Sequence, residues 1–149
     1  MKKRILSLLC ALVMILSLPV VACAADAEPR ASYYFSCTDV RAYAEDNGRI
    51  LIEIDVDATH TMQEVGASDV WIYEVYSNGD YEIVYSYTKE DYPNLIWTNS
   101  TCAYVDVTYQ GTVGKQYFAT VACYAKDSEG AERRYYDTNL VTAVQVEAD

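Results

Sequence analysis

Hydrophobic and polar residues alternate along most of the chain after about residue 32, which is the pattern of half-buried β-strands. The clearest run spans 49–59, where branched apolar residues alternate with acidic ones. The apolar set is Ile50, Ile52, Ile54 and Val56, and the acidic set is Glu53, Asp55 and Asp57. We expect the first set to face the core and the second set to face solvent.

Further strands are expected at 32–44, 70–77, 80–88, 101–109, from 115, and 133–146. Turns at Asn47-Gly48 and Asn78-Gly79 separate them. In the strand 70–77, Glu74 marks the solvent side, which predicts that Trp71, Tyr73 and Val75 face inward. Residues 60–68 read as a polar crossing loop, with Met62 and Val65 closing one end of the core. Seven strands without a credible helix predict an all-β, seven-stranded antiparallel β-sandwich.

Two resemblances sharpen this expectation. The run Tyr109–Gly130 resembles one end of a fibronectin type III domain, and 49–59 with 70–88 fits three of its earlier strands. The chain also resembles a family of small exported Firmicutes proteins of uncharacterised function. That likeness rests on Gly66-Ala67-Ser68 before Trp71-Ile-Tyr-Glu, on the Asn-Gly hairpin, and on Gly111-Thr-Val-Gly-Lys-Gln-Tyr.

These resemblances imply a fibronectin type III or immunoglobulin-like sandwich, and they imply no activity. A tyrosine that opens the next-to-last strand of such a sandwich forms a tyrosine corner. Tyr117 occupies that position, and we expect its hydroxyl to bond the backbone near 111–113. The strand 49–59 carries no cysteine, so the usual bridge between the two sheets of an immunoglobulin domain is excluded.

The N-terminus has the pattern of a targeting segment. Lys2, Lys3 and Arg4 precede an apolar run that is too short to span a membrane, and Ala22-Cys23-Ala24 fits a cleavage site. Residues 1–24 are therefore predicted to be a signal peptide, 25–31 a flexible leader, and 32–149 the sandwich domain. Because Val20-Val21-Ala22-Cys23 also resembles a lipobox, Cys23 is either removed or lipidated. We expect a protein that is secreted or associated with the cell envelope, without a membrane span.

Charge and motifs narrow the classes of function. The full chain has a net charge of −11, and the predicted mature chain keeps eight basic against 22 acidic residues, a net charge of −14. This acidity argues against nucleic-acid binding. His60 is the only histidine, and the chain has no nucleophile elbow, phosphate loop, zinc pattern or cofactor motif. We therefore expect no catalysis, no cofactor and no dedicated metal site.

The cysteines allow at most one internal disulfide in the mature domain, which keeps Cys37, Cys102 and Cys123. A hairpin centred on 110–114 would put residue 102 level with residue 123. Cys102 and Cys123 are thus the candidate pair, although alternation turns them to opposite faces.

Tyrosine is the unusual component, since all 15 tyrosines follow the predicted signal. Tyrosine offers flat contact area and a hydroxyl, which suits sugars and protein partners, although it also fills sheet faces that bind nothing. The candidate binding residues, expected on one outer face, are Tyr76, Tyr85, Tyr124, Tyr135 and Tyr136. They predict a non-catalytic binding or adhesion module for a protein or polysaccharide ligand. The alternative is a structural or stress-related envelope protein with no discrete ligand site.

Overall fold

The computed structural model describes residues 32–145; the predicted signal peptide, Cys23 and the leader lie outside that range. Within it no helix has the length and apolar character needed to cross a membrane. The strands are β1 (Phe35–Ala44), β2 (Arg49–Val75), β3 (Tyr81–Thr88), β4 (Ile96–Gln110), β5 (Gln116–Lys126), β6 (Ala131–Asp137) and β7 (Val141–Thr142). Two single-turn 3-10 segments, η1 (Asp46–Gly48) and η2 (Pro93–Leu95), precede β2 and β4.

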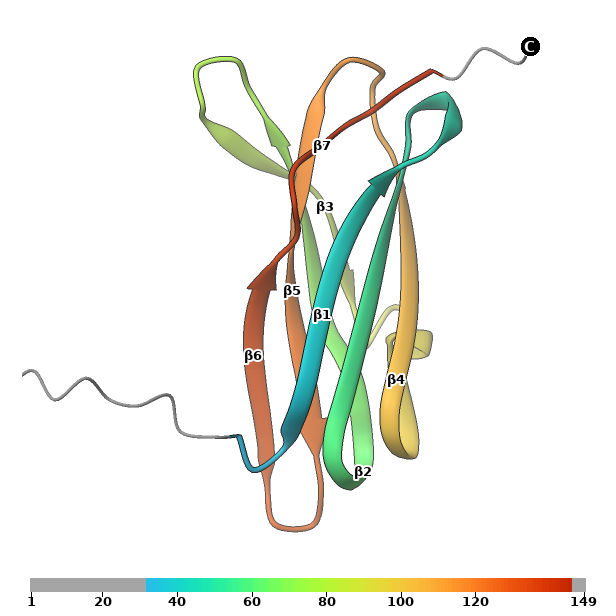
Figure 1. Cartoon of the computed structure of the whole chain (residues 1–149), viewed down its shortest axis with the longest axis vertical. Coiled ribbons are helices and arrows are strands. Elements are labelled where there is room, and N and C mark those ends of the chain that lie inside the picture. Colours follow the sequence, from blue (N-terminus) through green and yellow to red (C-terminus); the bar gives the residue numbers. More distant parts are fainter. Residues whose placement is uncertain (1–31, 146–149) are drawn as a thin grey trace, which may run out of the picture. The chain divides into compact units, whose positions relative to one another are not determined.

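All seven strands belong to one strongly curled antiparallel sheet (Figure 1). The long strand β2 is central to it, because it pairs with four of the other strands. The first part of β2 pairs with β1 and with β4, and its second part pairs with β5 and with β3. β6 and β7 extend the sheet beyond β5. The expected all-β antiparallel fold is confirmed, and the curl brings the inner faces of both parts around a single core.

The alternation of 49–59 is confirmed, because all four of its predicted inward residues are at most 1% exposed. They pack with Val70, Ile72, Val121 and Leu95 in the same core. This contiguous apolar interior is what the curled sheet encloses.

The crossing loop expected at 60–68 is instead part of β2. Met62 and Val65 are buried as predicted, yet the backbone from residue 62 to 66 pairs with β4. The change of direction is made by a register shift between Asp57 and Met62, opposite Cys102 and Ser100 of β4 and next to the left-handed residue Asn99. A bent strand therefore connects the two parts of the sheet, and its polar residues other than the buried Ser68 are at least partly exposed from a β conformation.

The predicted facing of 70–77 was wrong. Val70 and Ile72 are fully buried, whereas Trp71 and Tyr73 lie on the outer face and are partly exposed. Glu74, which had served as the marker of the wet side, is only 7% exposed. It can face inward because Lys115 and Tyr117 supply the ion pair and hydrogen bond that a buried carboxylate needs.

Candidate functional site: an aromatic face on the curled sheet

Five aromatic side chains gather on the outer surface of the sheet formed by β3, the second part of β2, β5 and β6. We call this group the aromatic face, and its members are Trp71, Tyr73, Tyr81, Phe118 and Tyr135. Strand pairing explains the grouping, because Tyr73 lies directly opposite Phe118, and paired residues point to the same side of a sheet. Tyr81 lies opposite Val75, two residues along β3 from Ile83, which is the β3 partner of Tyr73.

The rings touch one another in two groups. Tyr73 and Phe118 are parallel, with centroids 4.7 Å apart and planes at 7°. Tyr81 stands nearly perpendicular to both, at 5.5 Å from each centroid. Trp71 and Tyr135 form the second group, 6.2 Å apart at 26°. Offset and edge-to-face contacts of this kind hold aromatic rings in fixed positions.

The aromatic face is open to solvent and poor in charge. Tyr81 is 61% exposed and Tyr135 60%, and the exposed Ile83 extends the apolar area opposite Tyr73. Two polar contacts lie at its margin. Thr120 donates a hydrogen bond to Asp137 at 2.6 Å, and Arg133 lies 3.7 Å from the carboxylate of Asp69.

Only part of the predicted tyrosine set belongs to this surface. Tyr135 is a member, and Tyr124, on the same side of β5, lies under the Lys89 ammonium group, 4.1 Å from its ring centroid. Tyr85 is paired with buried Ile72 and points to the inner side, and Tyr136 packs against the core. Tyr76 follows the end of β2, where its hydroxyl bonds Glu82. The expectation that these five tyrosines share one face was therefore wrong.

A second group of tyrosines fills the inner side between β3 and β4. Tyr85, Tyr87 and Tyr92 form a chain of rings, with 4.8 Å between the centroids of consecutive ones. The hydroxyls of Tyr85 and Tyr92 are 2.6 Å apart, and Tyr87 donates to the carbonyl of Thr108 at 2.5 Å. Burial raises the pKa of Tyr87, with smaller contributions from neighbouring tyrosines. These contacts join two strands that do not pair in the described sheet, so this group serves the fold.

Tyr117 is 1% exposed, and its hydroxyl accepts a hydrogen bond from the Thr112 backbone N–H at 2.9 Å. The same hydroxyl donates to Glu74 at 3.1 Å, while Lys115 forms an ion pair with that carboxylate. The Lys115 hydrogen bond holds the pKa of Glu74 below its usual range against the opposing effect of burial, and Tyr117 adds to the lowering. This cluster anchors the turn before β5.

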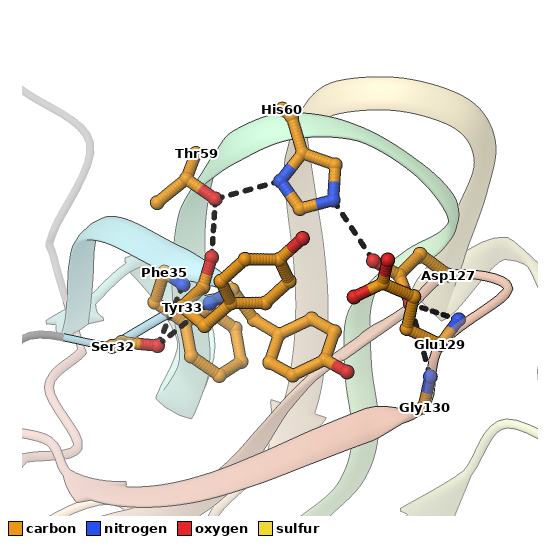
Figure 2. Close-up of polar contacts among 9 residues, drawn as sticks. Ser32, Tyr33, Phe35, Thr59, His60, Asp127, Glu129 and Gly130 are labelled. Carbon is orange, nitrogen blue, oxygen red and sulfur yellow. Dashed lines mark hydrogen bonds and ion pairs between the residues drawn. The ribbon is translucent and has the colours of Figure 1, made fainter.

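His60 links three parts of the chain near the bend of β2 (Figure 2). Its Nδ1 lies 2.9 Å from the Thr59 hydroxyl, and its Nε2 lies 2.9 Å from Asp127 in the turn between β5 and β6. Thr59 donates its own proton to the Tyr33 carbonyl at 2.5 Å. The His60 hydrogen bond is the main reason why the pKa of Asp127 is lowered.

This Thr-His-Asp row differs from a nucleophilic triad. In a triad the histidine accepts the proton of the hydroxyl. Here the Thr59 proton is directed to a backbone carbonyl, and the Tyr33 ring lies edge-on to the imidazole at 5.2 Å. The arrangement fastens the start of the domain to the bend of β2 and to the β5–β6 turn.

The acidic residues Glu53, Asp55 and Asp57, which we call the acidic stripe, lie on the outer side of the first part of β2. Asp55 is paired with Asp39 of β1, and Glu53 with Asp106 of β4, so carboxylates face carboxylates in these two pairs. Arg41 of β1 lies opposite Glu53 and forms an ion pair with Asp39 at 2.6 Å. Among residues 32–145 no group of three or more acidic, histidine or cysteine side chains is arranged to hold a metal ion. The stripe is a solvated face, opposite in character to the aromatic face.

The predicted Cys102–Cys123 disulfide is not formed, since Cys37, Cys102 and Cys123 are all free. The prediction assumed that β4 and β5 form a hairpin, but each of them pairs with β2 instead. Cys102 lies opposite Asp57, and Cys123 opposite Ala67. Burial raises the pKa of the Cys123 thiol to about 12, so it is a poor nucleophile.

Sequence reasoning missed most of the aromatic face because it placed Trp71 and Tyr73 in the core. A usable signal was present: Val70 and Ile72 alternate with aromatic residues, and β-branched side chains commonly supply the buried side of such a strand. The position of Phe118, by contrast, follows from simple alternation along β5, which turns it away from the buried Tyr117.

Comparison with known proteins identifies no family. None of the protein-family models matches this chain, and neither does any curated protein. The candidate site is therefore defined by its geometry.

Proposed function

We propose that this protein is an exported, non-catalytic binding module that acts through the aromatic face, with a protein or polysaccharide as its ligand. The observation that carries the proposal is a cluster of five aromatic side chains, two of them exposed and three partly exposed, on a strongly acidic chain. Exposed apolar patches on soluble domains commonly mark interaction sites. Secretion or attachment to the cell envelope follows from the N-terminal targeting pattern.

We further propose that the domain is a fibronectin type III-like sandwich. In this interpretation β1, the first part of β2 and β4 form one layer, and β3, the second part of β2, β5 and β6 form the other. The pairing partners of β2 support it, because they change along the strand in that order. The aromatic face then covers one layer and the acidic stripe the other.

The alternative is a structural or stress-related envelope protein without a discrete ligand site. The inner tyrosine group favours it, because it shows that tyrosine serves packing in this domain. The contacts of His60 support the non-catalytic part of the proposal. The neighbouring Thr59 hydroxyl donates its proton to the Tyr33 carbonyl, so it is not arranged to attack a substrate.

A screen of the purified protein on glycan and protein arrays, followed by variants, tests the proposal. The double variant Trp71→Ala/Tyr73→Ala should lose a saturable signal, since contact residues of this kind commonly contribute more than about 1 kcal/mol. Asp55→Asn/Asp57→Asn should bind as the unchanged protein does. Saturable binding that depends on the acidic pair would move the site to the other face, and silence on all arrays would favour the structural role.

A further inference from the structure

We infer that the ligand of the aromatic face is an uncharged polysaccharide chain that lies across the strands. This inference rests on the proposed binding function and narrows it to one class of partner. Three properties of the face support it: its charge, its shape and the chemistry of its side chains.

Charge excludes most ionic partners. The predicted mature chain has a net charge of −14, which repels anionic ligands. A cationic ligand would be drawn to the acidic stripe around Asp55 instead, where carboxylates face one another. The five members of the aromatic face are uncharged, and at its margin Arg133 lies 3.7 Å from Asp69, while Asp137 accepts a hydrogen bond from Thr120 and keeps its negative charge. A neutral ligand meets no electrostatic penalty there.

Shape favours a polymer over a small molecule. The aromatic face extends over four neighbouring strands, which lie about 4.8 Å apart. A cavity of about 390 Å³ lies beside Lys89 and Pro93, and another of about 280 Å³ beside Tyr76 and Lys115. No member of the aromatic face lines either of them. An open sheet face holds an extended chain through repeated contacts, whereas a single small ligand is bound best by a pocket that encloses it.

The side chains match the two kinds of surface on a sugar ring. A pyranose carries C–H groups on its faces and hydroxyls around its rim. Aromatic rings contact the C–H faces, and the phenol groups of the largely exposed Tyr81 and Tyr135 can exchange hydrogen bonds with the sugar hydroxyls. The ring contacts within the face restrict Tyr73 and Trp71 before binding, which lowers the entropy cost of contact.

Affinity electrophoresis of the purified full-length mature protein tests this inference. The gels contain soluble neutral polysaccharides, namely a β-glucan, xylan, galactomannan and pullulan, with polygalacturonate as the charged comparison. We expect retardation by at least one neutral polymer and none by polygalacturonate. Trp71→Ala/Tyr135→Ala should weaken the retardation about fivefold or more.

The chain offers a matched control in its second exposed tryptophan–tyrosine pair. Trp97 and Tyr104 of β4 are in edge contact at 6.1 Å and are 42% and 56% exposed. Trp97→Ala/Tyr104→Ala should keep the retardation, and circular dichroism establishes that both double variants are folded. If Trp97→Ala/Tyr104→Ala lost the retardation while Trp71→Ala/Tyr135→Ala kept it, the inference would be overturned.

The same variants separate failure of the inference from failure of the proposed function. If no neutral polymer retards the protein, but a purified protein partner binds it and binding is lost in Trp71→Ala/Tyr135→Ala, the inference fails and the binding function stands. If neither class of ligand binds, both fail.

Discussion

Replacing Tyr117 by phenylalanine isolates the contribution of one hydroxyl to the anchoring of β5. The ring remains, so the packing of a side chain that is 1% exposed is retained. Two hydrogen bonds disappear, one from the Thr112 N–H and one to the Glu74 carboxylate. Loss of a buried hydrogen bond typically costs about 0.5–1.5 kcal/mol, and more where a charged group is left without a partner.

The structure limits this cost. Glu74 keeps its ion pair with Lys115, and Thr112 is exposed, so water can reach its N–H. We therefore expect Tyr117→Phe to lower the free energy of unfolding by about 1–2 kcal/mol. Urea unfolding with an unchanged m-value measures it. Tyr135→Phe, on a ring that is 60% exposed, is the control and should change stability by less than about 0.5 kcal/mol. A change of less than about 0.3 kcal/mol for Tyr117→Phe would refute the reasoning.

Three further predictions concern the fold. Gly66→Ala should destabilise the protein by more than about 2 kcal/mol, because the new Cβ would lie 2.1 Å from the Leu95 carbonyl oxygen. Gly79→Ala should cost about 1 kcal/mol, because Gly79 has a left-handed φ of +87° but open space around it. Equal urea midpoints for the two variants would contradict this prediction. A thiol reagent should label Cys37 in the native protein and Cys123 only after unfolding, and rapid native labelling of Cys123 would show that it is accessible. The depressed pKa of Glu74 contributes stability above its unfolded pKa of about 4.5, and this is lost as the pH falls through the folded value. Stability measured at about pH 6 and about pH 3 should therefore fall less in Glu74→Gln than in the unchanged protein, and an equal fall would count against the ion pair.

The sequence predicted the parts of the fold in which local pattern and burial agree. The strand 49–59 alternates without interruption, and its apolar residues are the centre of the core. The turn at Asn47-Gly48 was also identified, and both residues have positive φ as expected. In these places a residue's own chemistry decides which way it points.

Prediction from the sequence failed where contacts with residues far away in the chain decide which way a side chain points or whether a segment forms a strand. Glu74 reads as a surface residue, and only its contacts with Lys115 and Tyr117, 41 and 43 residues away, make its inward position acceptable. The inverted facing of Trp71 follows from that one misassignment. The polar run 60–68 likewise reads as a loop, because its pairing partners in β4 and β5 come much later in the chain.

The position of Trp71 is the most direct test of the account, because a sandwich of the fibronectin or immunoglobulin type usually buries its tryptophan in the core. In Trp97→Phe, Trp71 is the only tryptophan, so its fluorescence can be followed alone. We predict that acrylamide quenches this emission in the native protein and that a bound neutral polysaccharide protects it. Emission that resists acrylamide in the free protein would place Trp71 in the core and contradict the aromatic face.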